Sequence, residues 1–283
     1  MIEINKDEFL LFKKYLLESC GLDIPLEKKY LFNTRLCELI RENNFKSFSD
    51  LYLNLKNGGS KELQKKIIEY MTTHETSFFR DTHPFETLQN IIIPKILSSK
   101  LKSSQSSPKI RMWSVACSTG QEPYSMAMIL QEEIDNNNSI EVKDVHILST
   151  DISNRAIKKA KKGLYTDDEV KKGMKEKYKE KYIKIKKNNM WQITDEIKAM
   201  IEFKEINLSR NFSNNLPFFD IIFCRNTIIY FSKELKQKII KQFCELLDYD
   251  GMLIVGASEN LYNLTDCFET EYMGQTIIYR VKK

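Results

Sequence analysis

Hydrophobic side chains in the first 70 residues recur at helical spacing and show little of the alternation expected of strands. Two apolar stripes are formed by Phe9, Leu10, Phe12, Leu16 and Leu17, and by Leu31, Leu36, Leu39 and Ile40. Helix breaks fit the Gly- and Pro-bearing segments 20–25 and 57–60, and a further helical pattern covers 61–71. The pattern predicts an all-α domain over residues 1–72.

After Pro108 short apolar runs alternate with helical patterns. The predicted strands cover 110–116, 145–150, 220–224 and 252–255, followed by a hairpin of 267–271 with 276–281. The predicted helices cover 84–97, 122–133, 153–163 and 233–247, and a polar loop is expected at 98–108. This alternation indicates an α/β fold, a doubly wound, mainly parallel sheet with an antiparallel hairpin at its edge.

The alternation is interrupted between Gly163 and Asn207 by a lysine-rich stretch. Short strand-like pieces follow it near 182–185, 191–194 and 200–203. We expect a small inserted β-subdomain at about 172–203 within a second domain that spans 73–283.

Composition narrows the class of protein. With 42% hydrophobic residues, nine Gly and six Pro in 283 residues, the chain is neither disordered nor low-complexity. No apolar run reaches the length of a membrane-spanning helix, and the start of the chain is acidic, so we expect a cytoplasmic protein without stable membrane insertion. Six cysteines without a C-x-x-C pair, and only three histidines, argue against a metal site.

The net charge of +5 is unevenly distributed. Residues 155–187 hold 14 Lys or Arg and 5 Asp or Glu, which is +9, so the rest of the chain sums to −4. Such a stretch can attract nucleic acid, anionic lipid or an acidic protein, or it can be a solvated lysine-rich surface. Charge alone does not choose among these.

Candidate chemistry lies at the strand exits, because ligands of open α/β sheets bind beyond the carboxyl ends of the strands. The first exit, 116–125, has small residues that let the backbone approach a ligand, but neither G-x-G-x-x-G nor a P-loop, which disfavours an NTPase. At the second exit Asp151 can accept bonds from ribose hydroxyls or cap the next helix, and the sequence leaves both open.

The third exit, 223–231, places Arg225, Asn226 and Tyr230 directly after an apolar strand. Buried polar groups of these kinds need partners, which favours a pocket over a core. Asn207 and Leu208, after another short apolar run, add an amide and an apolar wall that could contact an adenine.

These segments together resemble one family. The ordered blocks are H-E-T-S-F-F-R (74–80), R-M-W-S-V-A-C-S-T-G-Q-E-P-Y-S (111–125), S-T-D-I-S (149–153), N-L (207–208), F-C-R-N-T-I-I-Y-F (223–231), S-E-N (258–260) and G-Q-T-I-I-Y (274–279). Their order is similar to that in bacterial chemotaxis receptor methyltransferases, the CheR family, and the resemblance spans essentially the whole chain. It implies a class I, Rossmann-like methyltransferase domain with an inserted β-subdomain and an all-α N-terminal domain.

The resemblance also implies the activity and the site. The cofactor is S-adenosylmethionine, its product S-adenosylhomocysteine, and the substrates are glutamate γ-carboxylates on cytoplasmic helices of methyl-accepting chemotaxis receptors, which become methyl esters during sensory adaptation. The family's cofactor contacts map onto His74, Thr76, Arg80, Glu122, Asp151, Asn207, Leu208, Arg225 and Asn226. Tyr230 is placed beside the reacting methyl. The family usually has Asn where this chain has His74, so we expect an altered affinity or pH dependence.

The residue types suit this chemistry. A glutamate with a pKa near 4.3 is already anionic at neutral pH, so attack on a sulfonium methyl needs no general base. The enzyme has to align the carboxylate and exclude water. We expect Arg80 to orient a carboxylate by its two-pronged geometry, with Tyr230 packed beside it.

Two further expectations concern partners. The segment 186–191 has no glycine and is short, so we expect no tethering through a receptor C-terminal pentapeptide. The basic stretch 155–187 and the helix with Lys28, Lys29, Arg35 and Arg41 are then the candidate docking surfaces for acidic receptor helices.

Two alternatives remain at this stage. A nucleic-acid methyltransferase is favoured only by the basic stretch and lacks the Asn/Asp-Pro-Pro-aromatic signature of base amino-methylation. A cofactor-binding but inactive regulatory module is suggested only by His74.

Overall fold

A seven-stranded sheet forms the centre of the computed structural model, which describes residues 2–103, 108–137 and 139–282. The strand order is β6-β2-β1-β7-β8-β10-β9; β10 is antiparallel to both β8 and β9, and the other adjacent pairs are parallel. The strands are β1 (Ile110–Val115), β2 (Val145–Asp151), β6 (Ile201–Glu205), β7 (Phe219–Cys224), β8 (Leu247–Val255), β9 (Phe268–Met273) and β10 (Thr276–Val281). The predicted doubly wound sheet with a terminal hairpin is confirmed.

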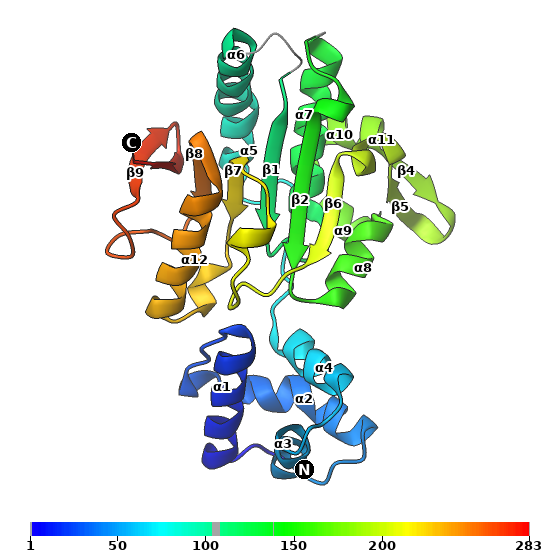
Figure 1. Cartoon of the computed structure of the whole chain (residues 1–283). Coiled ribbons are helices and arrows are strands. Elements are labelled where there is room, and N and C mark those ends of the chain that lie inside the picture. The colour runs from blue at the N-terminus through cyan, green and yellow to red at the C-terminus, as the bar shows by residue number, and fades with distance from the viewer. Residues whose placement is uncertain (1, 104–107, 138, 283) are drawn as a thin grey trace.

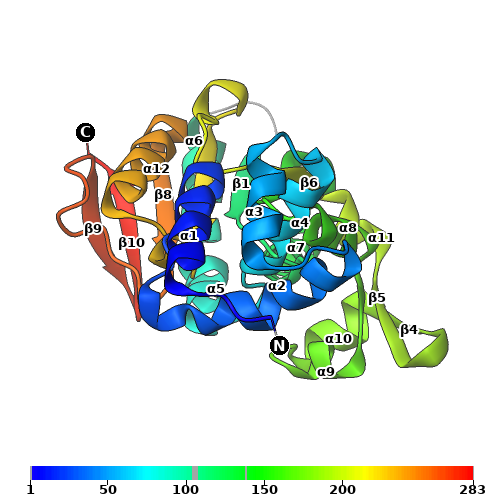
Figure 2. The same ribbon diagram turned by 90° about the horizontal axis from the view of Figure 1, so that it is seen from below.

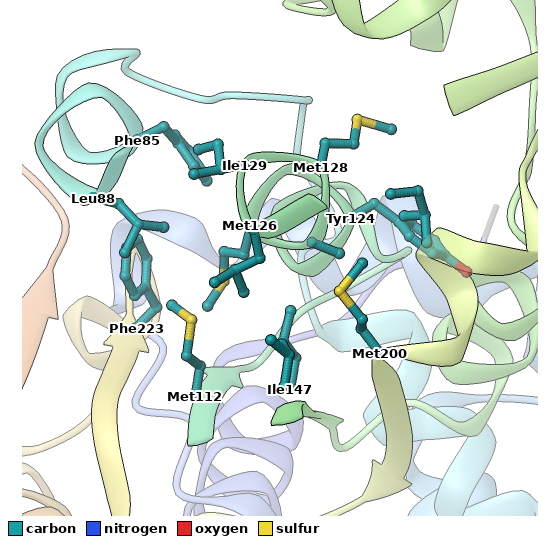
Figure 3. Packing of buried hydrophobic residues seen from close by; sticks show 14 of the residues in the cluster. Phe85, Leu88, Met112, Tyr124, Met126, Met128, Ile129, Ile147, Met200 and Phe223 are labelled. Carbon is teal, nitrogen blue, oxygen red and sulfur yellow. The ribbon is translucent and has the colours of Figure 1, made fainter. Parts of the chain in front are cut away.

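Alternate residues of the central strands feed two separate cores, one on each face of the sheet. On β1, Met112 belongs to one core and Trp113 to the other, and Phe223 and Ile222 divide in the same way on β7. Side chains on successive positions of a strand point to opposite faces, so the continuous apolar runs reflect burial on both sides. Figure 3 shows the first core, where the Met126 side chain points from its helix toward the strands.

Helices cover both faces. The helices of the α/β domain outside the insert are α5 (His83–Thr87), η2 (Leu88–Ile92), α6 (Ile93–Ser103), α7 (Gln121–Asn136), η3 (Val142–Asp144), α8 (Asn154–Lys162), η5 (Ser213–Asn215), η6 (Ile228–Tyr230) and α12 (Lys233–Leu246). α6 continues through Ser103, so the expected polar loop at 98–108 is wrong over 98–103, while 104–107 lie outside the described residues. Lys95, Ser98, Ser99 and Lys102 of this helix are exposed, while Ile96 and Leu97 are buried.

Within the described residues no helix combines the length and the apolar character that crossing a membrane requires. The six cysteines are all free thiols.

A second, three-stranded antiparallel sheet has the order β3-β5-β4. Its elements are β3 (Leu164–Tyr165), α9 (Asp167–Lys171), α10 (Glu176–Tyr182), β4 (Ile183–Lys186), η4 (Lys187–Asn189), β5 (Met190–Ile193) and α11 (Asp195–Ala199). Figures 1 and 2 both show the β4–β5 hairpin projecting on the side of the molecule opposite to β9. The strand near 200–203 belongs elsewhere, because β6 pairs in parallel with β2 in the large sheet, and the small sheet already begins at Leu164.

The N-terminal helices form a third core of their own. They are α1 (Lys6–Cys20), η1 (Leu26–Lys28), α2 (Tyr30–Glu42), α3 (Phe48–Lys56) and α4 (Lys61–Met71). Asn5 and Glu8 form a reciprocal capping box at the start of α1, and Gly21 ends that helix with φ +79°. Figure 1 shows this helical unit facing the edge of the sheet where β2 and β6 end.

Polar contacts attach the helical unit to the sheet on two sides. Leu22 forms an isolated antiparallel bridge with Phe231, and the Asp23 N–H donates to the Tyr230 carbonyl over 3.0 Å. On the other side Lys65 pairs with Glu205 at 2.8 Å. The helical unit is therefore joined to the end of β6 and to the segment that follows β7.

Candidate functional site

A cavity of about 580 Å³ lies between the carboxyl ends of the parallel strands and the helical unit. Strand order reverses between β1 and β7, which is where open α/β sheets bind their ligands. All ten predicted site residues line this cavity: His74, Thr76, Arg80, Glu122, Asp151, Asn207, Leu208, Arg225, Asn226 and Tyr230. The volume is within the range typical of small-molecule sites.

The loop after β1 has an unusual backbone. Ala116, Ser118 and Gly120 have φ values of +52°, +52° and +98°. Two of these are side-chain-bearing residues in the left-handed region, a strain that clusters at functional sites. A Cβ atom on Gly120 would lie 2.9 Å from the Ala160 Cβ atom, so glycine is required for the close approach to α8.

Asp151, at the end of β2, holds this loop in place. Its Oδ2 accepts the Ser118 N–H and its Oδ1 accepts the Ser153 N–H, both at 2.8 Å. The cap of α8 is instead the Ser153 hydroxyl, which accepts the Ala156 N–H, so Asp151 is not the helix cap. Burial raises the pKa of Asp151, although the Ser153 N–H and the nearby His74 oppose that shift. A carboxylate has about four lone-pair sites, so Asp151 keeps capacity to accept a bond from a ligand.

Arg225, at the end of β7, is the most buried cation of the cavity, with 1% of its side chain exposed. Nη1 bonds Glu122 Oε2 at 3.0 Å, and Nη2 bonds both Asp81 Oδ2 at 2.7 Å and the Arg80 carbonyl at 2.8 Å. Ser114 donates to the other Glu122 oxygen. Burial raises the pKa of Glu122, and the Arg225 charge opposes this. The guanidinium therefore holds the cavity wall together as well as lining it.

The segment that carries Arg80 contacts Arg225 through the Arg80 carbonyl and the Asp81 carboxylate. Phe79, Asp81 and Thr82 have positive φ values of +47°, +65° and +52°. Arg80 itself donates from Nη1 to the Glu75 carbonyl and is partly exposed. Its guanidinium is thus held at the cavity edge by backbone on one side, with donors left for a ligand.

The Asn207 side chain lines the cavity and also bonds to the helical unit. Its Nδ2 donates to the Ser19 carbonyl of α1 at 2.8 Å, and its Oδ1 accepts from the N–H and the hydroxyl of Ser209. The amide therefore ties the helical unit to the loop after β6. Leu208, which is 7% exposed, supplies the apolar wall together with Ile152.

The remaining predicted residues also line the cavity. His74 Nε2 lies 3.1 Å from the Thr72 hydroxyl, and the His74 carbonyl accepts the Ser118 hydroxyl. Asn226 has φ +57°, a conformation that asparagine tolerates better than most residues. Tyr230 is 36% exposed at the cavity edge, and Thr76 also lines it.

Sequence reasoning missed two groups of residues at this site. The first is the wall supplied by the helical unit, including Leu22, Asp23, Ile24 and Tyr30, because no local pattern shows how two domains meet. The second is the supporting carboxylates Asp81 and Glu259. Glu259 falls in the S-E-N block, which could have pointed to it.

The doubly wound sheet and a strand-end cavity with a buried aspartate and an apolar wall define a nucleoside-cofactor enzyme of the class I, Rossmann-like methyltransferase type. Residues 74–277 match the family "CheR methyltransferase, SAM binding domain", and residues 7–72 match "CheR methyltransferase, all-alpha domain". The chain belongs to the CheR family of chemotaxis protein methyltransferases.

Curated relatives cover nearly the whole chain. "Chemotaxis protein methyltransferase 1" of Pseudomonas aeruginosa is 35% identical over 97% of this chain and 98% of its own length. "Chemotaxis protein methyltransferase" of Vibrio anguillarum is 34% identical over 99% of both chains, and the protein of the same name from Borreliella burgdorferi is 34% identical over 92% of this chain and 90% of its own. The protein is thus an S-adenosylmethionine-dependent methyltransferase.

The residues present fit S-adenosylmethionine. A buried carboxylate suits the ribose hydroxyls, and an apolar wall suits the adenine. Asp151 and Leu208 supply these groups on the neighbouring exits of β2 and β6, and the small residues Ala116, Cys117 and Ser118 line the cavity at the next exit, after β1.

Proposed function

We propose that this protein transfers methyl groups from S-adenosylmethionine to glutamate side chains of chemotaxis receptors. The observation that supports the proposal most directly is that all ten expected residues line one cavity, with Arg80 and Tyr230 at its partly exposed edge. A receptor glutamate has to reach the cofactor from solvent, so the groups that receive it belong at that edge.

We assign the predicted residues to different parts of the cofactor. Asp151 accepts bonds from the ribose hydroxyls, Leu208 packs against the adenine, and Glu122 and Arg225 form the wall at the reacting end. His74, Thr76, Asn207 and Asn226 complete the cofactor site. When bound, the cofactor would supply a methyl group on a positively charged sulfur; a carboxylate oxygen of the receptor would take the methyl group, and S-adenosylhomocysteine would be the leaving group.

The chain's own contribution is orientation and exclusion of water. Arg80 holds a carboxylate by two N–H groups, while Tyr230 packs and donates a hydrogen bond beside the acceptor oxygen. No residue needs to take a proton, because the glutamate is already ionised at neutral pH.

The direct test combines methyl-labelled S-adenosylmethionine with receptor-containing membranes. Incorporated label that mild base releases as methanol indicates a carboxyl methyl ester and supports the proposal. Label that resists base indicates N-methylation and rejects it. Cofactor binding without incorporation rejects it in favour of a regulatory module.

Replacing Arg80 with alanine is expected to lower the rate of methyl transfer at least tenfold. The loss follows from the missing orientation of a carboxylate, which is worth several kcal/mol in well-aligned reactions. Initial rates at saturating cofactor measure it, with Arg210→Ala as the control because Arg210 is exposed and does not line the cavity. Near-native rates for Arg80→Ala discard the role.

We also propose that receptors are not held through a C-terminal pentapeptide. The β4–β5 connection is the short segment between Lys186 and Met190, which pair directly, and Asn188 and Asn189 make the turn with positive φ. This leaves little loop to enclose a peptide. Isothermal titration with a receptor C-terminal pentapeptide is expected to show no binding up to millimolar concentration, and measurable affinity would contradict the proposal.

For the docking surface of receptor helices we compare the basic stretch 155–187 with the basic residues of the helical unit. Several lysines of 155–187 form ion pairs within the protein, for example Lys172 with Glu75 at 3.3 Å and Lys175 with Glu86 at 3.1 Å. Arg35 donates to the carbonyl of Met71 at the end of α4, so it supports the interdomain segment. Lys28, Lys29 and Arg41 therefore remain as the better candidates.

The division into domains at 1–72 and 73–283 is likewise proposed. The separate apolar core of the helical unit and the two matched family ranges support it. For the inserted β-subdomain we propose the range 164–193, which contains all three strands of the small sheet.

A further inference from the structure

Glu259 is a buried carboxylate to which the mechanism above assigns no task. It follows β8 in the segment 258–260 and is 6% exposed. It does not line the cavity, so it does not reach the cofactor or the substrate.

Both of its oxygens accept hydrogen bonds from backbone N–H groups. Oε2 accepts from Asn226 and from Gly256, each at 2.7 Å. Oε1 accepts from Thr227 at 2.7 Å and from Ile229 at 3.3 Å. An ionised carboxylate has about four lone-pair sites and no donor, so it suits this set of four donors.

Three of the four donors belong to the loop 225–231 after β7, which carries Asn226 and Tyr230. Asn226 is held in the left-handed region, a conformation that the surrounding contacts must maintain. At the far end of the loop the Tyr230 carbonyl accepts the Asp23 N–H of the helical unit. The loop is therefore fixed by Glu259 from the sheet side and by the helical unit from the other.

We propose that Glu259 is a positioning residue, which places Tyr230 and Asn226 in the cavity through these backbone bonds. The inference rests on the proposed role of Tyr230 in methyl transfer. An amide at this position has one acceptor oxygen and turns its NH₂ group toward backbone donors, so about half of the bonds are lost without a change in size.

Gly256 offers an independent way to disturb the same contact. A Cβ atom there would lie 2.8 Å from Glu259 Oε2 and 2.9 Å from the Asn226 nitrogen. Its φ is not positive, so alanine fits the backbone and acts as a steric wedge between the carboxylate and the loop. Gly256→Ala should therefore reproduce the effect of Glu259→Gln while the carboxylate remains.

The test compares Glu259→Gln, Gly256→Ala and Tyr230→Phe, alone and combined, in the full chain. Glu259→Gln is expected to lower kcat for receptor methylation about tenfold or more, with a smaller change in the Kd of S-adenosylhomocysteine. In the Tyr230→Phe background the same change should cost less than about twofold, because the residue it positions is already altered. Glu18→Gln, on the exposed surface of α1, is the control.

Hydrogen exchange supplies a readout that does not depend on activity. Both Glu259→Gln and Gly256→Ala should speed amide exchange in a peptide covering 225–231 and leave the strands of the sheet protected as in the parent protein. An equal loss of kcat in both Tyr230 backgrounds, or unchanged exchange over 225–231, overturns the positioning role. If the parent protein fails to methylate receptors, the proposed function fails, and the exchange data alone decide whether Glu259 holds the loop.

Discussion

Replacing Arg225 with methionine is expected to destabilise the protein by about 3–5 kcal/mol, which is the usual cost of removing one partner from a buried ion pair. The guanidinium is almost fully buried and bonds Glu122, Asp81 and the Arg80 carbonyl. Without it, the Ser114 hydroxyl is the one side-chain partner left to the Glu122 carboxylate among the described residues. Methionine preserves much of the volume, so the loss reports charge and hydrogen bonding more than a cavity.

Thermal unfolding at pH 8 measures this change, and the midpoint is expected to fall by roughly 10 °C. Arg210→Met, at an exposed site, should shift it by less than about 2 °C. Arg225→Lys keeps the charge but not the fork of donors, so an intermediate loss is expected. A midpoint within 2 °C of the parent for Arg225→Met would show that the ion pair does not stabilise the fold.

The same variant has a predictable pH dependence. Burial already raises the pKa of Glu122 above its usual value, and the Arg225 charge opposes that rise. In Arg225→Met the folded-state pKa should rise further, so the folded state binds a proton more readily than the unfolded chain. Stability then falls as pH increases. The difference from the parent protein should be smaller at pH 5.5 than at pH 8.

The regular part of the fold could be predicted from hydrophobic pattern alone. Strands such as 219–224 are buried on both faces and flanked by helices with a single apolar stripe, so they have unambiguous patterns. Residues 98–103 were predicted as a loop because most of them are polar or basic, although they form the last turns of α6. The strand at 200–203 was assigned to the wrong sheet because the sequence of a short strand does not indicate which sheet it pairs with.

The site residues that directly follow a strand could be predicted from the sequence, because the strands themselves could be. Asp151, Arg225 and Tyr230 stand directly after strands, and strand exits meet at one edge of a parallel sheet. The polar partners were not predictable, because Asn207 bonding to Ser19 and Arg225 bonding to Asp81 join segments more than 140 residues apart. Such partners depend on how the helical unit and the segment 79–82 pack onto the sheet.

The Asp151→Asn variant is expected to bind S-adenosylhomocysteine on the order of a hundredfold more weakly than the parent. Two charge-assisted bonds to ribose hydroxyls are worth about 1.5–3 kcal/mol each, and an asparagine can supply at most one neutral acceptor in their place. The amide NH₂ also turns toward either the Ser118 or the Ser153 N–H, which Asp151 now accepts. Either the loop 116–120 or the start of α8 then loses an anchor.

Isothermal titration at pH 8 measures the affinity, with Asp195→Asn as the control because Asp195 is fully exposed on α11. The parent protein should also lose affinity as pH falls, since binding needs the ionised carboxylate and burial raises the pKa of Asp151. The Asn variant has no carboxylate at 151 to protonate, so its affinity should lack this component of the pH dependence. Affinity within threefold of the parent would remove Asp151 from the cofactor site and leave it only the task of holding Ser118 against the end of β2.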